Sequence, residues 1–297
     1  MKKTVNHKAP FDLRNQNSFF GSWPVIDDTD QNYAIAIAFP VEGWQESACV
    51  VVSQNQVGEL TAEANVVKDS KRAIDQALAT LSLDVDDTGW EGVGQADRVI
   101  GELQHKYSYL RPVLFHSPYE AAAGFVIGQR ISVKQRQAIQ QRLAEELGDE
   151  IEVEGKKYHA FPQPQKLLEV TEHKGLNETK LERLKGVAQA ALDGTLTREH
   201  LLGVSPEKVL EKLQALPGIG PFYASGILYR GAGVVDDITD DKLTKYVIKK
   251  AYRLDSEPNQ KEALQIAEKW KPYRMWCEVL LHVWLRREVG MPKMGER

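Results

Sequence analysis

The chain has 297 residues, enough for two domains, and its 42% hydrophobic and 27% charged residues are ordinary for a globular protein with a core. The net charge of −4 argues against a protein that binds nucleic acid through a uniformly basic surface. Two cysteines are too few for a disulfide framework or a four-thiolate iron–sulfur cluster. Because no apolar run approaches about eighteen residues, we expect a cytoplasmic protein that is neither secreted nor membrane-bound.

The first hundred residues have the pattern of a sheet with a few helices. Runs of β-branched or alternating apolar residues predict strands, and Ile74, Leu78 and Leu81 fall on one face of a predicted helix. The predicted elements in chain order are strands at 33–40 and 48–54, a helix at 70–81, a loop at 84–94 and a short helix at 97–106.

A helical region begins at Ser117. This serine is a suitable N-cap, Pro118 stands at the first helical position, and Glu120 completes a capping box. We therefore expect an α+β domain over 1–110, an all-helical domain over 111–290 and a tail over 291–297. Further helices are predicted at 133–147, 163–170, 177–193, 205–215, 222–230, 241–253, 259–269 and 272–288, and a loop or short hairpin at 151–161.

The segment 216–241 joins a Pro-Gly-x-Gly turn to a helix and then to an acidic pair. Pro217 and Gly218 predict a tight turn, and neither Gly218 nor Gly220 has a Cβ that would keep a polyanion from its amide. Unpaired amides at the start of the following helix favour an anion, as does the helix dipole. Such a turn is also a common connection between two helices, so the motif gains meaning only from its context.

The context is a known family pattern. The hairpin, the Asp pair about twenty residues later and the run YEAAAGFVIGQRISVKQRQAI from Tyr119 resemble the helix-hairpin-helix superfamily of DNA glycosylases. The match is closest to the DNA-3-methyladenine glycosylase II family and covers roughly residues 80 to 290. The resemblance implies an α+β N-terminal domain, an antiparallel sheet with helices, followed by an all-α glycosylase core. This agrees with the elements predicted above.

Asp241 is the catalytic residue that the resemblance implies, because it stands just before the helix that follows the hairpin. Cleavage of an N-glycosidic bond builds positive charge on the deoxyribose, and a fixed carboxylate can stabilise this charge and orient a water. Asp240 and Asp241 are also suitable helix N-caps, a role that is compatible with catalysis. We assign catalysis to Asp241 and only a structural role to Asp240.

Phe222 distinguishes two kinds of glycosylase. Members of the superfamily that also nick the strand have a lysine at the second position after the Gly-x-Gly, where it forms a Schiff base with the sugar. This chain has Phe222 at that position, and Lys242 and Lys245 lie in another element. We therefore expect a monofunctional hydrolase that leaves an abasic site.

Aromatic side chains are expected to form the base pocket, because an alkylated purine carries positive charge and is attracted to π-rich surfaces. Trp284 matches the stacking tryptophan of the family's C-terminal helix, and each of the other candidates could equally be a core residue. Gly226 replaces a pocket tyrosine of some members, which would widen or reshape the pocket. The candidates are Trp284, Phe222, Tyr223 and Trp276.

The DNA contacts implied by the resemblance are the backbone of Gly218 and Gly220 for a phosphate, and Gln129 and Arg130 in the loop after the first core helix. Arg130 stands where the family places a wedge that fills the gap left by a flipped base, although a surface arginine is the simpler interpretation. The family also holds a monovalent cation on hairpin carbonyls. The seven histidines show no metal-ligand spacing, so we expect no other cofactor and no zinc site.

The preferred interpretation is a DNA repair enzyme that flips an alkylated purine of the 3-methyladenine or 7-methylguanine type out of double-stranded DNA and hydrolyses its glycosidic bond. We expect it to act as a monomer on nucleoid DNA. Two alternatives stay open: a non-catalytic protein that binds damaged DNA through the hairpin, and a glycosylase for oxidised or deaminated bases. Retention of both Asp241 and Trp284 favours catalysis over binding alone.

Overall fold

In the computed structural model, which describes residues 1–20, 23–65 and 68–291, the chain forms two compact units that are each discontinuous in sequence. The first unit contains 1–6, 17–84 and 113–233, and the second contains 7–16, 85–112 and the region from Val234 onward. These units do not test the predicted linear domains 1–110 and 111–290. The predicted tail 291–297 lies almost entirely outside the described residues.

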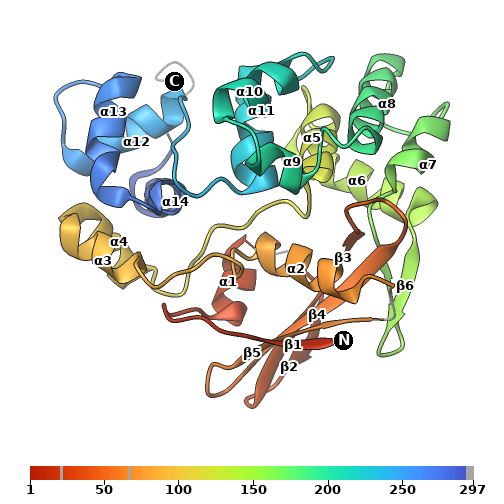
Figure 1. The fold of residues 1–297 in the computed structure, drawn as a ribbon, viewed down its shortest axis with the longest axis horizontal. Helices are drawn as coiled ribbons and strands as arrows, with labels where there is room; N and C mark the ends of the chain where they lie inside the picture. Colours follow the sequence, from red (N-terminus) through yellow and green to blue (C-terminus); the bar gives the residue numbers. More distant parts are fainter. Residues whose placement is uncertain (21–22, 66–67, 292–297) are drawn as a thin grey trace. The chain divides into compact units, whose positions relative to one another are not determined.

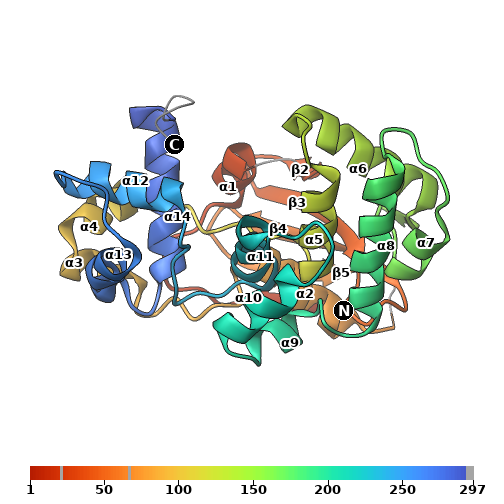
Figure 2. The same ribbon diagram turned by 90° about the horizontal axis from the view of Figure 1, so that it is seen from above.

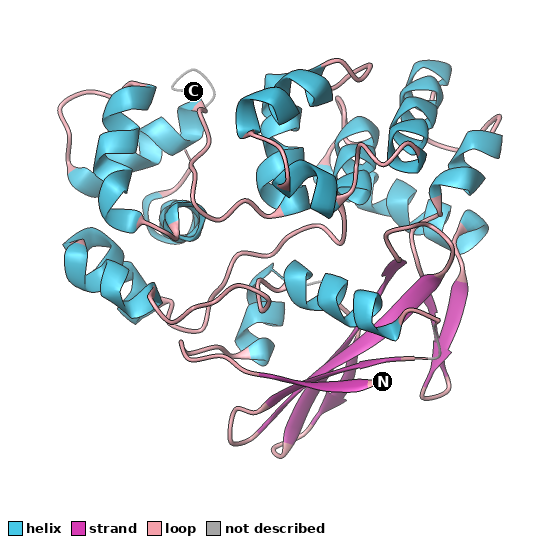
Figure 3. Cartoon of the chain, in the orientation of Figure 1, coloured by secondary structure: helices cyan, strands magenta, loops and turns pink. Residues whose placement is uncertain are grey.

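The sheet of the first unit has five antiparallel strands in the order β1-β5-β4-β3-β2 (Figures 1 and 3). The strands predicted at 33–40 and 48–54 are confirmed as its centre, where Ile35 pairs with Val52 and Ile37 with Val50, all fully buried. The strands missed from the sequence are short and partly exposed. The bounds are β1 Lys2–Val5, β2 Val25–Asp28, β3 Asn32–Pro40, β4 Ser47–Asn55 and β5 Leu60–Ala64.

Helix α2, Ser70–Thr80, packs against β4 and β5 and confirms the predicted helix at 70–81. Its N-cap Asp69 accepts a hydrogen bond from the Arg72 amide, and its buried face includes Ile74 and Leu78. The apolar spacing of 3.6 residues therefore predicted the packed face correctly.

Helix α5, Pro118–Ile127, is the central helix of the first unit and packs against α6, α8 and the segment that follows α11 (Figure 2). Its N-cap is as predicted, since Ser117 accepts a hydrogen bond from the Glu120 amide, but the predicted capping box is wrong because the Glu120 side chain pairs with His116 instead. Short Ala and Gly side chains let its neighbours approach from several sides. The other elements here are α6 Val133–Leu147, β6 Glu150–Val153, β7 Lys156–His159, α7 Pro164–Glu169, α8 Glu178–Leu192, α9 Arg198–Leu202, α10 Pro206–Gln214, α11 Pro221–Gly226 and a π-helix Ile227–Ala232.

The second unit is helical, with a core of aromatic rings. Trp90, Tyr273 and Trp276 pack edge to face or tilted, with ring centroids 5.2–5.6 Å apart. Arg111 is buried, pairs with Asp87 and lies over the Trp276 ring. The elements are α3 Trp90–Ala96, α4 Arg98–Lys106, α12 Lys242–Tyr252, α13 Gln260–Ala267, a 3-10 turn Glu268–Trp270, α14 Arg274–Trp284 and a π-helix Leu285–Val289, while α1 Leu13–Phe20 has residues of both units.

The predicted loop at 84–94 is wrong from Trp90 onward, because α3 occupies that stretch. Gly94 of this stretch and Gly101 of α4 serve packing, because a Cβ added to Gly101 would lie 2.5 Å from the Gly94 carbonyl oxygen. Helix α3 is stabilised by the burial of Trp90. The isolated glycines around this residue hid the helix in the sequence. None of the helices in the described part of the chain is long and apolar enough to cross a membrane.

Candidate active site

The Pro-Gly-x-Gly turn connects α10 to α11 as a hairpin in the first unit. Ile219 anchors the turn, since its side chain is buried and its amide donates to the Leu216 carbonyl at 3.0 Å. Pro221 then occupies the first position of α11, and Gly220 is the N-cap. The helix predicted at 222–230 is confirmed, although its second half, Ile227–Ala232, is a π-helix.

The two glycines of the hairpin are required for different reasons. Gly218 has φ +84°, and a Cβ there would lie 2.5 Å from Cδ of Arg183. Gly220 has an extended backbone, with ψ −179°, and nothing lies within 4 Å of the position of a Cβ. Gly218 is therefore demanded by the fold, whereas Gly220 keeps an open space over its amide.

Gln129 is bound to the hairpin rather than left free for a ligand. Its Nε2 donates to the Gly218 carbonyl at 2.7 Å, and its Oε1 accepts from Nη1 of Arg183 at 2.5 Å. A chain of contacts thus runs from α8 through the loop after α5 to the turn. The structure brings Gln129 and Gly218, two of the predicted DNA-binding residues, together, and it gives Gln129 a role in supporting the turn.

Arg130 is exposed and has φ +56°, a conformation that non-glycine residues seldom adopt. It borders a cavity of about 780 Å³ to which Lys180 and Arg183 also contribute, and none of the described residues that line the cavity has a carboxylate. Because three cationic side chains converge there, the hollow is suited to an anionic ligand. The remaining lining comes from Gln129, Ile131, Gly175, Leu176, Asn177, Thr179 and Tyr223.

Phe222 and Tyr223 lie beside a second, smaller cavity of about 190 Å³ in the first unit. Tyr223 stacks on Phe125 at 5.1 Å between centroids, and Phe222 is 68% exposed. A cavity of about 150 Å³ accepts one benzene ring, so this hollow is large enough for a single aromatic ring or a little more. Two of the four predicted aromatic residues therefore meet at one aromatic-lined hollow, which also includes Val133 and Arg136.

Gly226 has a different role from the one expected. A Cβ at this position would lie 2.5 Å from Cζ of Phe125, so the space left by the missing side chain is already filled by that ring. Of the two expected effects, a wider or a reshaped pocket, the first is corrected: the glycine admits the Phe125 ring from α5, which stacks on Tyr223.

Asp241 lies in the second unit as the N-cap of α12. Its Oδ1 accepts from the Thr244 amide at 2.8 Å, and its Oδ2 accepts from the Thr239 hydroxyl at 2.7 Å. The predicted capping role is present, and it holds the carboxylate in one orientation. Asp240, by contrast, pairs with Lys245.

A buried acid, Glu278 of α14, lies behind this cap and was not foreseen. Its Oε2 accepts from the Thr239 amide at 2.9 Å, and its Oε1 lies 2.9 Å from the Thr244 hydroxyl. The same hydroxyl lies 3.3 Å from Nε2 of His282. The cluster Thr239, Asp241, Thr244 and Glu278 is called the threonine–acid cluster below. The signal in the sequence was a single acid within the apolar run MWCEVLLHVW.

The two predicted tryptophans of α14 differ in exposure. Trp284, the last residue of the helix, is half-buried. Trp276 is 1% exposed and packs against Trp90, Tyr273 and Arg111. Trp276 is therefore corrected from a pocket candidate to a core residue, because its ring has no face left for a ligand.

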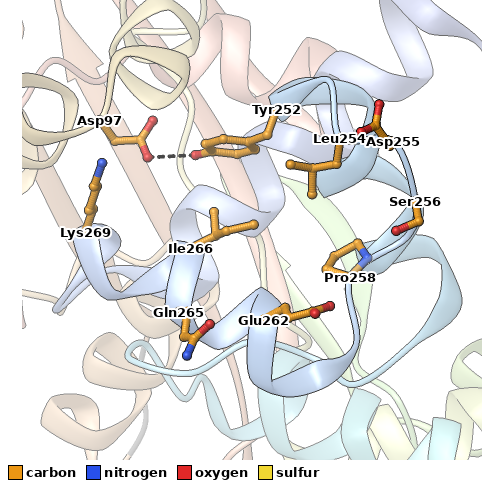
Figure 4. A pocket seen from close by; sticks show the side chains of 10 residues that line it. All are labelled: Asp97, Tyr252, Leu254, Asp255, Ser256, Pro258, Glu262, Gln265, Ile266 and Lys269. Atoms are coloured by element: carbon orange, nitrogen blue, oxygen red, sulfur yellow. Dashed lines mark hydrogen bonds between the residues drawn. The ribbon is translucent and has the colours of Figure 1, made fainter.

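The second unit has a cavity of its own of about 570 Å³, between α12 and α13 (Figure 4). The Tyr252 hydroxyl donates to Asp97 at 2.8 Å there, and burial of the Tyr252 ring, together with Asp97, raises its pKa. Asp97 also caps α4 through the amides of Val99 and Ile100. The carboxylate oxygens of Asp97 thus hold helices together. The cavity is lined by both acidic and basic side chains. Across the described ranges no three His, Cys, Asp or Glu side chains gather as a metal site.

Comparison with known proteins gives a consistent result. No protein-family model matches the chain. By sequence the chain is similar to a DNA-3-methyladenine glycosylase of Bacillus subtilis, 27% identical over 210 residues, or 68% of each protein. It is also 26% identical over 172 residues to a probable bifunctional transcriptional activator and DNA repair enzyme AlkA of Mycobacterium tuberculosis, a match that covers 57% of this chain and 33% of that one.

Solved structures share the fold. A 3-methyladenine DNA glycosylase from Archaeoglobus fulgidus superposes with a TM-score of 0.75, at 19% identity, over 96% of this chain and 98% of that one. A Clostridium acetobutylicum 8-oxoguanine glycosylase/lyase in complex with double-stranded DNA superposes with a TM-score of 0.69, at 18% identity, over 97% and 98%. At these identities the likeness defines the fold, and it includes enzymes of more than one specificity.

Proposed function

We propose that this chain, which is related by sequence to DNA-3-methyladenine glycosylases and has the fold of DNA glycosylases, excises alkylated purines from double-stranded DNA in base excision repair. The observation that carries the proposal is the carboxylate of Asp241, both oxygens of which are held by hydrogen bonds at the start of α12. A carboxylate fixed in this way can act at a developing positive charge without first reorganising. The α+β domain followed by a helical core is proposed as the arrangement that presents it.

The proposed reaction is hydrolysis of the N-glycosidic bond. The bond between C1′ and the base nitrogen breaks, its electron pair leaves with the base, and positive charge develops on the sugar. Asp241 stabilises that charge and orients a water, whose oxygen bonds to C1′ while its proton passes to the carboxylate or to solvent. The products are the free base and an abasic site.

The hairpin is proposed to hold a phosphate of the damaged strand. The open space over the Gly220 amide supports this role, because a side chain there would meet an approaching phosphodiester. Arg130 is proposed as the wedge that replaces the extruded nucleotide, and its exposed guanidinium beside cationic neighbours supports it. Because each phosphate that a cation neutralises releases counterions, binding is expected to weaken as the salt concentration rises, with a slope set by the number of such contacts.

Selection of alkylated purines is proposed to rest on aromatic faces. Phe222 and Tyr223, with Phe125 behind them, present stacked rings at a hollow of about 190 Å³, and Trp284 is partly exposed. A cationic purine is attracted to such faces. It is also a better leaving group than a neutral base, so a permissive pocket would suffice.

A monofunctional mechanism is proposed from Phe222. The fold alone does not decide the point, since one similar structure is named a glycosylase/lyase. Phe222 offers no amine at the hairpin, and Lys245 is paired with Asp240. Water is therefore the proposed nucleophile.

A monovalent cation at the hairpin is a further proposal from the resemblance. The Leu216 carbonyl accepts from the Ile219 amide and the Gly218 carbonyl from Gln129, and each retains a second lone pair. Those carbonyls could contribute to such a site, and no step above depends on it. We also propose that the protein acts as a monomer on nucleoid DNA.

The test is release of a base from a defined duplex. Purified protein is incubated with duplexes that carry one 7-methylguanine or one hypoxanthine, and abasic sites are revealed by alkaline cleavage. The proposal predicts abasic sites from the 7-methylguanine duplex. Tight binding without release would instead favour a non-catalytic damage-binding protein, and release from hypoxanthine alone would favour a deaminated-base enzyme.

A further inference from the structure

The hydrogen bonds around Asp241 exceed those that a helix cap requires. A capping aspartate needs one oxygen to accept from the amide three residues on, and the Thr244 amide satisfies that need at Oδ1. The second oxygen accepts from the side chain of Thr239, two residues before the cap. Rotation of the carboxylate about its last bond is therefore blocked at both oxygens.

The threonine–acid cluster has a crossed arrangement. Thr239 donates its amide to Glu278 and its hydroxyl to Asp241, at 2.9 and 2.7 Å. Thr244 donates its amide to Asp241 and directs its hydroxyl to Glu278, at 2.8 and 2.9 Å. Four hydrogens from two threonines thus serve four oxygens of two acids, all within the second unit.

The burial of the cluster makes this arrangement stiff. Thr244 is 1% exposed and Glu278 is 5% exposed, so water cannot easily replace a lost partner. Glu278 binds the segment before α12 onto α14 through the Thr239 amide. The Thr239 hydroxyl lies near Glu278 and the Thr244 hydroxyl as well, and it also reaches Oδ2 of Asp241, a contact that anchoring the segment to α14 does not require.

We propose that Thr239 is a positioning residue for Asp241, with its hydroxyl fixing the carboxylate for attack at the sugar and Glu278 fixing Thr239 in turn. This inference rests on the proposed glycosylase function. It adds positioning residues to the proposed site, because the two threonines and Glu278 are assigned no contact with the reacting atoms. Catalysis belongs to Asp241, and the cluster determines its orientation.

The contact between the Thr239 hydroxyl and Glu278 determines which variants test the proposal. The Thr239 hydroxyl has a single hydrogen, yet it lies 2.7 Å from Asp241 and 2.5 Å from Oε1 of Glu278. Replacing Glu278 by glutamine keeps an oxygen for the Thr239 amide and puts an NH2 group in place of Oε1, the acceptor that competes for the Thr239 hydrogen. The Thr244 hydroxyl loses the same acceptor and still has Nε2 of His282 at 3.3 Å. The hydrogen of Thr239 then remains for Asp241, and the positioning should survive.

The experiment measures single-turnover release of 7-methylguanine from duplex DNA, together with affinity for an abasic-site duplex and the melting temperature. Thr239→Val should lower the release rate by about ten-fold or more at a temperature at which the variant is fully folded, with affinity near that of the wild type and a melting temperature that falls by a few degrees because the hydroxyl bonds are lost. Thr239→Ser and Glu278→Gln should each stay within about three-fold of the wild type, because both keep the hydroxyl bond to Asp241.

Three results would overturn the inference. Thr239→Val could release base at the wild-type rate, Thr239→Ser could be as slow as Thr239→Val, or Glu278→Gln could lose more than about ten-fold with its melting temperature unchanged. The first two would remove the hydroxyl from the mechanism, and the third would assign the charge of Glu278 a direct part. If the wild type released no base, the proposed function itself would fail. If the wild type released base and one of these three results occurred, only the inference about Thr239 would fail.

Discussion

The side-chain amide of Gln129 donates to the carbonyl of Gly218 at 2.7 Å, so the loop after α5 and the hairpin are tied together by one residue of the motif. Arg183 completes the contact from α8, both by binding Gln129 and by occupying the space where a side chain at Gly218 would lie. The turn that is proposed to hold a phosphate is thus supported by polar contacts from α8 and from the loop after α5. The roles of Gly218 and Gly220 can be separated by substituting each glycine in turn.

Gly218→Ala should destabilise the protein by about 1–3 kcal/mol, since alanine is strained at φ +84° and its Cβ meets Arg183. Gly220→Ala should leave the unfolding midpoint unchanged, because its Cβ would enter open space. If a phosphate approaches that amide, Gly220→Ala should still weaken binding to duplex DNA several-fold. Chemical denaturation and a fluorescence binding assay measure both effects, and unchanged DNA affinity of Gly220→Ala would remove the phosphate from this turn.

Arg130→Asn should slow base release while leaving stability intact. Asparagine tolerates the left-handed conformation of Arg130 at φ +56°, so only the guanidinium is lost. The loss of rate should be smaller when the lesion faces a mismatched base, because extrusion is then easier. Single-turnover rates on paired and mismatched duplexes provide the comparison. Equal rates for wild type and variant on both duplexes would leave Arg130 as a surface charge.

Borohydride should trap no covalent complex between the protein and a substrate duplex. Trapping requires a Schiff base, and the position of the lyase lysine holds Phe222. Denaturing electrophoresis of labelled DNA after incubation with borohydride measures this. A trapped species that disappears in Lys242→Ala or Lys245→Ala would show that an amine outside the hairpin reaches the sugar.

Glu42 should make stability fall as the pH rises from about 5 to 8. Burial raises its pKa from the ordinary 4.5 to about 7, although the Arg198 amide and guanidinium oppose the shift. Because the folded-state pKa is the higher one, the stabilising contribution is complete below about 4.5 and is lost as the pH passes about 7.

Glu42→Gln keeps an acceptor for the Arg198 amide and does not titrate. The wild type should therefore lose on the order of 2–3 kcal/mol relative to this variant between pH 5 and pH 8. Denaturant titrations at both pH values measure the difference. Parallel pH dependence in the two proteins would show that Glu42 ionises without penalty.

Local signals in the sequence predicted the elements whose patterns are self-contained. Helix α6 was predicted with the bounds it has, and the structure shows that its N-terminus is closed locally by a capping box between Ser132 and Gln135. The cap at Asp241 was predicted in the same way. Both depend on residues a few positions apart.

Features that depend on distant partners were missed. The glycines within 84–94 suggested a loop, because the packing of Gly94 against Gly101 is a tertiary contact that the local sequence does not reveal. Gly226 suggested an open pocket because the ring that fills its space comes from Phe125, about a hundred residues away. Glu278 was overlooked because its partners lie on another element, although a lone acid in an apolar helix was a usable signal.

The most direct measurement is single-turnover release of 7-methylguanine by the wild type and by Asp241→Asn. Asparagine is as good an N-cap as aspartate, so α12 and the melting temperature should be preserved. The account predicts that the variant binds an abasic-site duplex normally and releases base at least about a hundred-fold more slowly, because the fixed negative charge is gone. Release at the wild-type rate by a folded Asp241→Asn protein would contradict it.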